Sequence, residues 1–387
     1  MTEQSAILAP VVFDGSKWHS DAAVLYGDGA VTGIVPASRL PDSLNAQRLD
    51  EGMLVPGFVD LQVNGGGGVL MNDDPSIETI ETICRAHSRF GTTALLPTLI
   101  TDTPERTQQA INAAQTALQR GVPGCLGLHL EGPHLSLARR GAHDADLVRP
   151  AGDDDIERLL ATAAAINNLL VTMAPEAVTE KQVRALSDAG VKVSLGHSDA
   201  GCKTASAMVA AGASLFTHLF NAMSPLGHRE PGMVGAALSE PDVFAGLIAD
   251  GIHVDPTSMG VAIRGKRGPG KMFLVTDAMS TIGSDLTEFT LNGRTVYRSE
   301  GRLTLADGTL AGADIDMIAS VRVLVEQVGV ELGEALRMAS LYPARAMGIE
   351  ASHGRIGEDA RADFVHLTDA LAVRQVWIGG ASVFAAV

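Results

Sequence analysis

The stretch that decides the fold is LLVTMAPEAVTEKQVRALSDAGVKVSLGH, residues 169–197. It begins with the apolar run LLVTM at 169–173, continues with a helical pattern over 179–190, and ends with a second apolar run, VSLGH at 193–197. This order is typical of two parallel strands, because a crossover helix is needed to return the chain to the same end of the sheet. The stretch therefore predicts one unit of a parallel α/β fold.

The same alternation repeats on both sides of this unit. One helical pattern can be capped by Ser76 and ends at Gly91, and another begins at Thr103-Pro104 and stops at Gly121. Further helical patterns cover 155–165, 204–211 and 314–328. The other candidate strands are VDLQV from Val59, ALLPT from Ala94, LGLHL from Leu126, LFTHL from Leu215, GLIAD from Gly246 and FLVTD from Phe273. With the two strands above they make eight, so we expect a (β/α)8 TIM-type barrel with its chemistry at the C-terminal ends of the strands.

The two ends of the chain have the patterns of short strands separated by turns. The runs are AILAPVVF from Ala6, AAVLY from Ala22, AVTGIV from Ala30, DFVHL from Asp363, RQVWI from Arg374 and SVF from Ser382. Neither end has enough strands for a stable sheet alone, so we expect the two ends to pair. The expected organisation is a small β-sandwich domain built from residues 1–55 and 350–387, with the barrel at 56–349.

Two local features interrupt the barrel pattern. EFTL and RTVY flank Asn292-Gly293, which predicts a β-hairpin with a type I′ turn. The run Gly65 to Gly68 resembles a phosphate-binding nest, but no Lys-Ser/Thr pair follows it. We interpret this glycine run as a flexible turn at the barrel mouth.

The composition excludes several classes of function. Among the 387 residues 46% are apolar and 19% are charged, so the chain can bury a large core and is neither disordered nor fibrous. The 29 basic and 45 acidic residues give a formal charge of −16, which disfavours binding to nucleic acid or anionic lipid. Cys84, Cys125 and Cys202 are far apart, and no signal segment or membrane span is evident, so we expect a cytoplasmic protein.

Polar residues end or follow several of the predicted strands. They are Gln62, Asn64, Glu131, His197, His218, His253 and Asp277. Glu131, His197 and His218 offer one carboxylate and two imidazoles, the ligand set of a catalytic metal site that keeps a position for water. A divalent ion there would make that water acidic enough for hydrolysis. Taken singly, each histidine could be a structural hydrogen-bonding residue, Glu131 could cap the next loop, and Asp277 could accept hydrogen bonds from the following turn.

Local motifs resemble those of a known family. They are PGFVDLQVNGGGG from Pro56, LHLEGPHL from Leu128, VSLGHSDA from Val193, THLFNAM from Thr217, ADGIHV from Ala249, LVTDAM from Leu274 and GTLAGA from Gly308. In this order they are similar to the motifs of the N-acetylglucosamine-6-phosphate deacetylases, members of the metal-dependent amidohydrolase superfamily. The similarity extends to GRIGEDARADFVHL near the C-terminus. It implies that acetate is removed from the amino sugar phosphate to give glucosamine 6-phosphate.

The resemblance implies a role for each of the central residues. Glu131, His197 and His218 would hold one divalent ion, and Asp277 would be the general base and acid that takes a proton from water and delivers it to the leaving amine. Zinc is the metal we expect, and iron, cobalt or manganese would accept the same ligands.

The pattern after the first barrel strand departs from that of many amidohydrolases. They carry His-x-His there and hold a second ion, whereas this chain has Gln62-Val63-Asn64. Amide side chains are poor ligands compared with imidazole. We therefore expect one tightly held ion per subunit.

The resemblance also assigns residues to the substrate. Asn221, the backbone of Ala222 and the Arg229 guanidinium would bind phosphate, although position alone would make Arg229 an exposed loop charge. Arg229 would reach across a dimer interface, so a homodimer is expected. His143 and His253 would take part near the acetamide, the sugar or the phosphate, and either could fill either role. The remaining pocket residues would be Ala142, Asp250, Gly251, Ile252, Thr309, Leu310 and Ala311.

Three alternatives stay open at this point. The galactosamine epimer of the substrate differs only at its 4-hydroxyl, which no motif discriminates. Another amidohydrolase reaction, such as purine deamination or opening of a cyclic amide, is disfavoured by Asn221 and Arg229 because such substrates lack phosphate. A catalytically silent scaffold would have lost its ligands, whereas all of them are present here.

Overall fold

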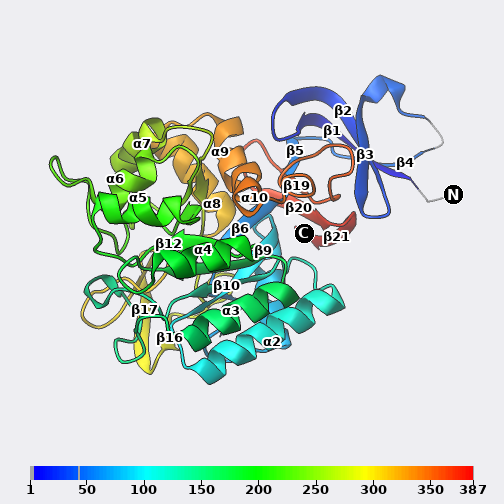
Figure 1. Cartoon of the computed structure of the whole chain (residues 1–387). Coiled ribbons are helices and arrows are strands. Elements are labelled where there is room, and N and C mark those ends of the chain that lie inside the picture. The colour runs from blue at the N-terminus through cyan, green and yellow to red at the C-terminus, as the bar shows by residue number, and fades with distance from the viewer. Residues whose placement is uncertain (1–3, 42–43, 387) are drawn as a thin grey trace.

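The computed structural model describes residues 4–41 and 44–386, and its centre is an eight-stranded parallel barrel (Figure 1). The barrel strands are β6 (Phe58–Val63), β9 (Thr92–Ile100), β10 (Leu128–Glu131), β11 (Leu169–Met173), β12 (Lys192–Leu195), β13 (Leu215–Phe216), β14 (Phe244–Leu247) and β15 (Met272–Leu274). Each strand pairs with its neighbour in chain order, and a parallel bridge between Val63 and Ala278 joins the first strand to the segment after the last. The predicted barrel is confirmed.

Several strands are shorter than the apolar runs that predicted them. The run from Leu215 to Leu219 forms a strand only over Leu215–Phe216. The backbone turns away directly afterwards, because His218, Phe220 and Ala222 all have positive φ angles. A strand cannot continue through such residues, so the sequence after β13 forms a loop at the barrel mouth instead.

Helices cover the outside of the barrel. They are α1 (Ile77–Ser88), α2 (Pro104–Arg120), α3 (Asp153–Ala165), α4 (Glu180–Asp188), α5 (Cys202–Ala210), α6 (Gly232–Ser239), α7 (Pro256–Gly265), α8 (Met317–Val323) with a π-helical continuation at Leu324–Val328, α9 (Leu332–Ala339) and α10 (Leu341–Met347). The side chains of Ser76 and Thr103 accept hydrogen bonds from the first turns of α1 and α2, as their positions predicted. The helix expected from Asp314 begins only at Met317, because Asp316 is its N-cap. Within the described residues, each helix is too short or too polar to cross a bilayer.

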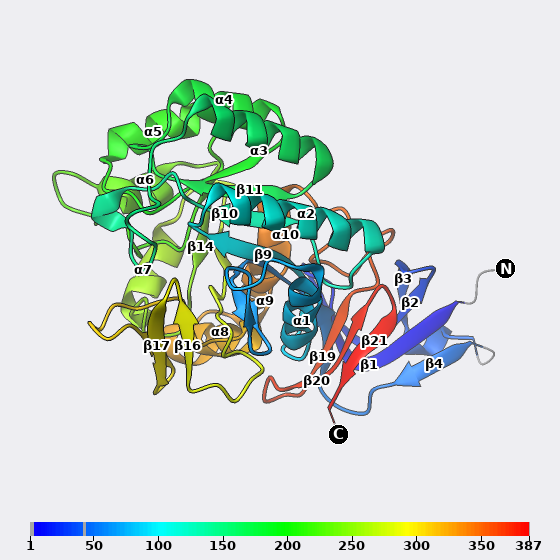
Figure 2. The same ribbon diagram turned by 90° about the horizontal axis from the view of Figure 1, so that it is seen from below.

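The two ends of the chain form one further sheet beside the barrel (Figure 2). Its strands are β1 (Ser5–Phe13), β2 (Trp18–Gly27), β3 (Ala30–Pro36), β4 (Asn45–Arg48), β5 (Met53–Pro56), β19 (Phe364–Leu367), β20 (Val373–Ile378) and β21 (Ala381–Ala385). The two ends meet where β5 pairs with β19 in antiparallel register, with Val55 opposite Val365. Burial of Phe364 and Trp377 against strands from the N-terminal end makes one core out of both ends.

A small three-stranded sheet follows the last barrel strand. It consists of β16 (Glu288–Leu291), β17 (Arg294–Ser299) and an unexpected third strand, β18 (Arg302–Thr304). Asn292 and Gly293 both have positive φ angles, as a type I′ turn requires. Leu291, Val296 and Leu303 pack against Met279 and thereby attach this sheet to the segment after β15.

The glycine run at the barrel mouth is a short hairpin packed over a buried histidine. β7 (Gly65–Gly66) pairs with β8 (Val69–Leu70), and His87 Nε2 donates a hydrogen bond of 2.9 Å to the carbonyl of Gly65. A Cβ at Gly66 would lie 2.9 Å from the His87 ring, so glycine is required for this approach. Burial lowers the pKa of His87 to about 4, and its Nδ1 has no hydrogen-bond partner among the described residues.

His87 should make the protein less stable in mild acid. In the unfolded chain a histidine binds a proton below about pH 6.5, whereas folded His87 resists protonation down to about pH 4. Stability from this residue is therefore complete above pH 6.5 and is lost as pH falls toward 4. His87→Gln keeps a donor for Gly65 but removes the titrating ring. As pH falls through this window, we expect its free energy of unfolding to decrease less steeply than that of the wild type, with the two slopes differing by roughly 1.4 kcal/mol per pH unit. Chemical denaturation at several pH values measures the slopes; His228→Gln, at an exposed loop, should retain the wild-type slope.

Candidate metal centre and active site

Four titratable side chains converge at the C-terminal end of the barrel. Glu131 ends β10, His197 and His218 lie two residues after the ends of β12 and β13, and Asp277 lies three residues after the end of β15. All four line one pocket of about 410 Å³. Their convergence follows from the fold, since neighbouring parallel strands end at the same edge.

Three of these side chains form a compact triangle of donor atoms. Glu131 Oε1 lies 3.2 Å from both His197 Nε2 and His218 Nε2, and the two nitrogens are 3.0 Å apart. Ligands of a tetrahedral zinc ion, with bonds of about 2.0–2.1 Å, lie roughly 3.3 Å from each other. The triangle therefore has nearly the size that one such ion requires.

The second ring nitrogen of His197 prepares that ring for a metal. His197 Nδ1 lies 2.9 Å from the carbonyl oxygen of Arg139, which can only accept. Nδ1 therefore keeps a proton, and Nε2, which faces Glu131 and His218, is the nitrogen that can give its lone pair to a metal ion. The Nδ1 atom of His218 is buried and has no partner among the described residues.

The side chains of the triangle shift one another's pKa values. Burial alone would raise the pKa of Glu131, but hydrogen bonds and charge from His197 and His218 hold it well below its ordinary value. Burial would lower the pKa of His218, and Glu131 raises it instead. The carboxylate is thus ionised, as a metal ligand must be.

A second grouping of possible ligands includes His143. One atom each from Glu131, His143 and His197 also lies within 4.8 Å of the others. His143 Nε2 is 3.9 Å from Glu131 Oε2, well beyond the distances in the triangle with His218. The geometry of the triangle is therefore the better match to a metal site.

The backbone at the site is held in an unusual conformation. His197, His218 and Asp277 have φ angles of 47°, 27° and 51°. Left-handed backbone at a non-glycine residue is costly and is retained where the surrounding structure enforces it, often at functional sites. Here it turns three side chains from the strand ends into the pocket.

Two amide side chains engage the Asp277 carboxylate. Asn64 Nδ2 donates to Asp277 Oδ1 at 2.7 Å, and Gln62 Nε2 donates to the same oxygen at 3.2 Å and to Glu131 Oε1 at 3.0 Å. The amide oxygens cannot occupy these positions, because they would repel the carboxylates. Burial, with the charge of Glu131 adding to it, raises the pKa of Asp277 to about 6.

The two remaining histidines of the pocket have different partners. His253 Nδ1 lies 2.6 Å from Asp250 Oδ2, so the Nδ1–H group donates a hydrogen bond to that carboxylate. His143 Nδ1 lies 3.3 Å from the backbone nitrogen and 2.8 Å from the Oγ1 of Thr101. Burial, followed by the charge of His197, lowers the pKa of His143 to about 3, so this ring is neutral.

Most of the residues that the sequence suggested for the substrate line the same pocket. Those in the lining are Ala142, His143, Asn221, Ala222, His253, Thr309 and Leu310. Asp250 lies behind His253, Gly251 and Ile252 continue that loop outside the lining, and Ala311 is buried in the core of the small sheet.

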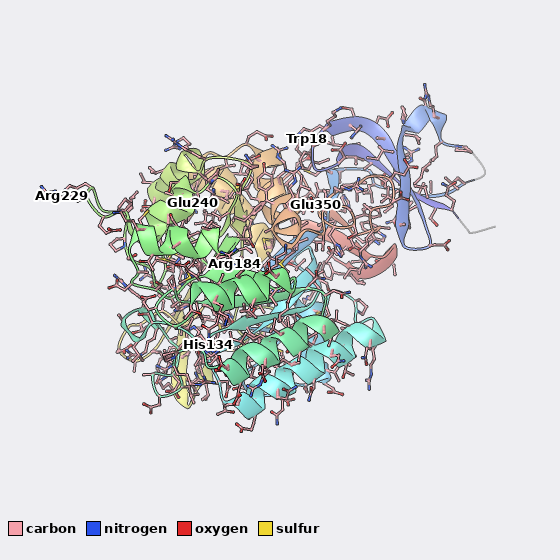
Figure 3. All side chains as sticks on the ribbon, in the orientation of Figure 1. Trp18, His134, Arg184, Arg229, Glu240 and Glu350 are labelled. Carbon is pink, nitrogen blue, oxygen red and sulfur yellow. The ribbon has the colours of Figure 1, made fainter. Side chains whose placement is uncertain are left out.

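Arg229 is not in this pocket. It is exposed at the tip of the loop that projects from the barrel (Figure 3). The loop extends because Gly227 and Glu230 close its base through a backbone hydrogen bond and leave the residues between them in solvent. Arg229 therefore does not reach the pocket of its own chain, and its expected contact with phosphate across a dimer interface stays a prediction.

Sequence patterns missed the apolar part of the pocket. Ile100, Ile248, Met279 and Leu291 contribute to its wall. Leu291 comes from the inserted hairpin, Ile248 lies in the predicted strand GLIAD, and Ile100 and Met279 lie two residues beyond the runs ALLPT and FLVTD. The only available signal was their position beside strand ends.

The chain matches the sequence model of the amidohydrolase family over residues 53–383. It is 43% identical over 361 residues to the N-acetylgalactosamine-6-phosphate deacetylase of Shewanella sp. (strain ANA-3), covering 92% of this chain and 90% of that protein. It is 37% identical over 366 residues to the N-acetylglucosamine-6-phosphate deacetylase of Haemophilus influenzae, covering 94% of this chain and 95% of that protein. The crystal structure of N-acetylglucosamine-6-phosphate deacetylase from Pasteurella multocida superimposes with a TM-score of 0.95 at 34% identity, covering 99% of this chain and 100% of that one.

Proposed function

Because the chain belongs to the amidohydrolase family, we propose that it hydrolyses the N-acetyl group of N-acetyl-D-glucosamine 6-phosphate to D-glucosamine 6-phosphate and acetate. The observation that carries this proposal is the Asp277 carboxylate in one pocket with the triangle of Glu131, His197 and His218. A general base beside a metal site is the arrangement that amide hydrolysis by water requires.

The chain's own residues divide the work of hydrolysis. When bound by Glu131, His197 and His218, a divalent ion would make a water acidic and polarise the acetyl carbonyl. Asp277 takes the proton from that water and delivers it to the sugar nitrogen as the carbon–nitrogen bond breaks. Its Oδ1 is held by two amides, and among the described residues no hydrogen bond engages Oδ2, which is left for the proton.

The two pocket histidines take separate roles. The backbone N–H of Thr101 can only donate, so His143 Nδ1 accepts and the neutral ring carries its proton on Nε2. We assign His143 as the donor to the acetyl carbonyl oxygen. His253 is braced by the Asp250 carboxylate and is assigned to the sugar or its phosphate.

We propose one metal ion per subunit, with zinc as the first candidate and iron, cobalt or manganese as alternatives. Gln62 and Asn64 present amide N–H groups to Glu131 and Asp277, on the side where a second ion would need ligand lone pairs. These hydrogen bonds satisfy the carboxylates without a second cation.

A cytoplasmic location is proposed because Cys84, Cys125 and Cys202 are all free thiols.

We propose that the protein acts as a homodimer. Among the described residues, the pocket lining includes no lysine or arginine, although the substrate carries a phosphate dianion. Asn221, Ala222 and His253 offer hydrogen bonds there, and Arg229 is free to extend away from its own barrel. Arg229 of a second copy would supply the missing charge.

An assay of acetate release tests the function. With the metal-replete protein, kcat/KM for N-acetylglucosamine 6-phosphate should exceed that for unphosphorylated N-acetylglucosamine by roughly 100-fold or more, because loss of charge-assisted phosphate contacts costs about 3 kcal/mol or more. Equal rates would exclude a phosphate-binding pocket. A metal-replete protein inactive on every acetylated sugar phosphate would instead favour a catalytically silent scaffold.

A second candidate substrate is N-acetyl-D-galactosamine 6-phosphate. The observation that favours it is the 43% identity to the Shewanella enzyme, which is named for that substrate. The two sugars differ only at the 4-hydroxyl, so the same assay run on both epimers, at matched concentrations, decides between them by the ratio of kcat/KM.

A further inference from the structure

We propose that Thr101 is a positioning residue that sets the tautomer and orientation of His143, and thereby aims a hydrogen-bond donor at the substrate's acyl oxygen. Thr101 directly follows β9, is 1% exposed and does not line the pocket. It contacts the pocket mainly through His143, whose Nδ1 faces both its N–H and its hydroxyl, and the same hydroxyl makes a longer hydrogen bond of 3.5 Å to the backbone carbonyl of Glu131. The inference rests on the proposed function for its catalytic meaning.

The two contacts with Thr101 favour one tautomer of the neutral His143 ring. The Thr101 N–H lies 3.3 Å from His143 Nδ1 and can only donate. If Nδ1 carried the proton, two buried N–H groups would face each other and the amide would lose its partner, which is costly away from water. With Nδ1 unprotonated, the Thr101 hydroxyl can also donate to it at 2.8 Å. The proton of the neutral ring is therefore on Nε2.

This tautomer gives His143 its chemical role. A protonated Nε2 has no lone pair for a metal, so His143 is a donor and not a ligand, although it lies close to Glu131 and His197. His143 Nε2 is 3.9 Å from the nearer oxygen of Glu131, too far for a hydrogen bond, so this N–H remains available. A donor fixed beside the metal site can stabilise the charge that develops on the acyl oxygen.

Asn72 fixes the two residues on either side of Thr101. Asn72 Oδ1 accepts from Ile100 N at 3.2 Å, and Asn72 Nδ2 donates to Ile100 O at 3.2 Å and to Asp102 Oδ2 at 2.9 Å. These bonds form a bracket around Thr101. On the other side, a Cβ at Gly132 would lie 2.2 Å from Thr101 Oγ1. Glycine at 132 thus leaves room for the hydroxyl, and the bracket keeps the backbone N–H directed at His143.

Substitution of Thr101 tests the proposal by kinetics. Thr101→Val keeps the shape and removes the hydroxyl; we expect kcat for deacetylation to fall about 10- to 100-fold with KM changed less than about threefold. Thr101→Ser, which restores the hydroxyl, should recover most of kcat. The matched control is Thr92→Val at the start of β9, the strand that ends just before Thr101, because Thr92 is equally buried and its hydroxyl has no partner among the described residues. Circular dichroism and the metal content of all three variants verify folding and loading.

Nitrogen-15 NMR of the histidine rings tests the proposed tautomer of His143 without substrate. The NMR result therefore does not depend on whether the protein is a deacetylase. The His143 signals are identified by their absence in His143→Gln. We expect Nδ1 to show the shift of an unprotonated ring nitrogen in the wild type. In Thr101→Val the backbone N–H is retained, so Nδ1 should remain unprotonated, and its signal should move only by the amount that loss of the hydroxyl hydrogen bond causes. A protonated Nδ1 in the wild type, or a kcat for Thr101→Val equal to that of Thr92→Val, would overturn the proposal. A normal NMR result in a protein that deacetylates no sugar phosphate would refute the proposed function and leave the tautomer assignment intact.

Discussion

We expect Asp277→Asn to lower kcat for deacetylation by roughly 10⁴-fold, because one residue serves as both general base and general acid. The amide has nearly the same shape, can keep a carbonyl oxygen toward Asn64 and Gln62, and touches none of the three triangle atoms. Metal content and substrate affinity should therefore stay close to those of the wild type. Steady-state kinetics, metal analysis and a binding titration with the sugar phosphate measure the three quantities.

Asp60→Asn provides the matched control for this substitution. Asp60 is a fully buried carboxyl, and burial raises its pKa to about 7, as burial raises that of Asp277 to about 6. It lies below the site, where its oxygens accept hydrogen bonds from Thr276 and from the backbone of Gln62. We expect kcat of this variant to remain within about tenfold of the wild type, since asparagine keeps one acceptor and Asp60 does not reach the pocket. Similar losses in both variants would mean that Asp277 supports the structure and does not transfer protons.

The barrel and its central residues could be predicted because their signals are local. Each apolar run is long enough to identify a strand, and the polar residue at its end, such as Glu131 or Asp277, needs only the fold to bring it to the site. The N-caps Ser76 and Thr103 are equally local, since each acts on the helix that it precedes. The match between one repeating pattern and one known architecture supplies the remaining information.

The rest depends on contacts that no local pattern contains. Thr101 contacts His143 across 42 positions, and Asn72 fixes Thr101 through residues 28 to 30 positions away. The third strand of the inserted sheet, β18, is short and mostly polar, and it is a strand because it pairs with β17. Arg229 is a further case, because its residue type suits phosphate while the solvent-exposed position of its loop, which only the structure shows, leaves any phosphate contact to a second copy of the chain. Such features follow from tertiary packing and become visible only in the assembled structure.

His218→Gln should empty the metal site. Removing one of three ligands leaves a carboxylate and one imidazole, and the glutamine amide is a poor replacement. We expect metal content to fall from about one ion per chain to less than about 0.1 after dialysis, and turnover to be lost with the metal. The metal dissociation constant should rise by well over 100-fold, because loss of a residue that only supports a ligand already raises it by about 10- to 100-fold. Metal analysis and competition with a chelator measure these effects.

His129→Gln is the matched control for the metal prediction. His129 is a buried imidazole on β10, two residues before Glu131, and its Nε2 contacts the Thr172 hydroxyl instead of the triangle. The same substitution there should leave metal content near one, because the donor atoms are untouched. If both variants lost the ion equally, general disruption of the barrel would explain the loss. If the wild type held nearly two ions and needed both, the amides of Gln62 and Asn64 would have to release Glu131 and Asp277, and the hydrogen bonds on which the one-ion proposal depends would be wrong.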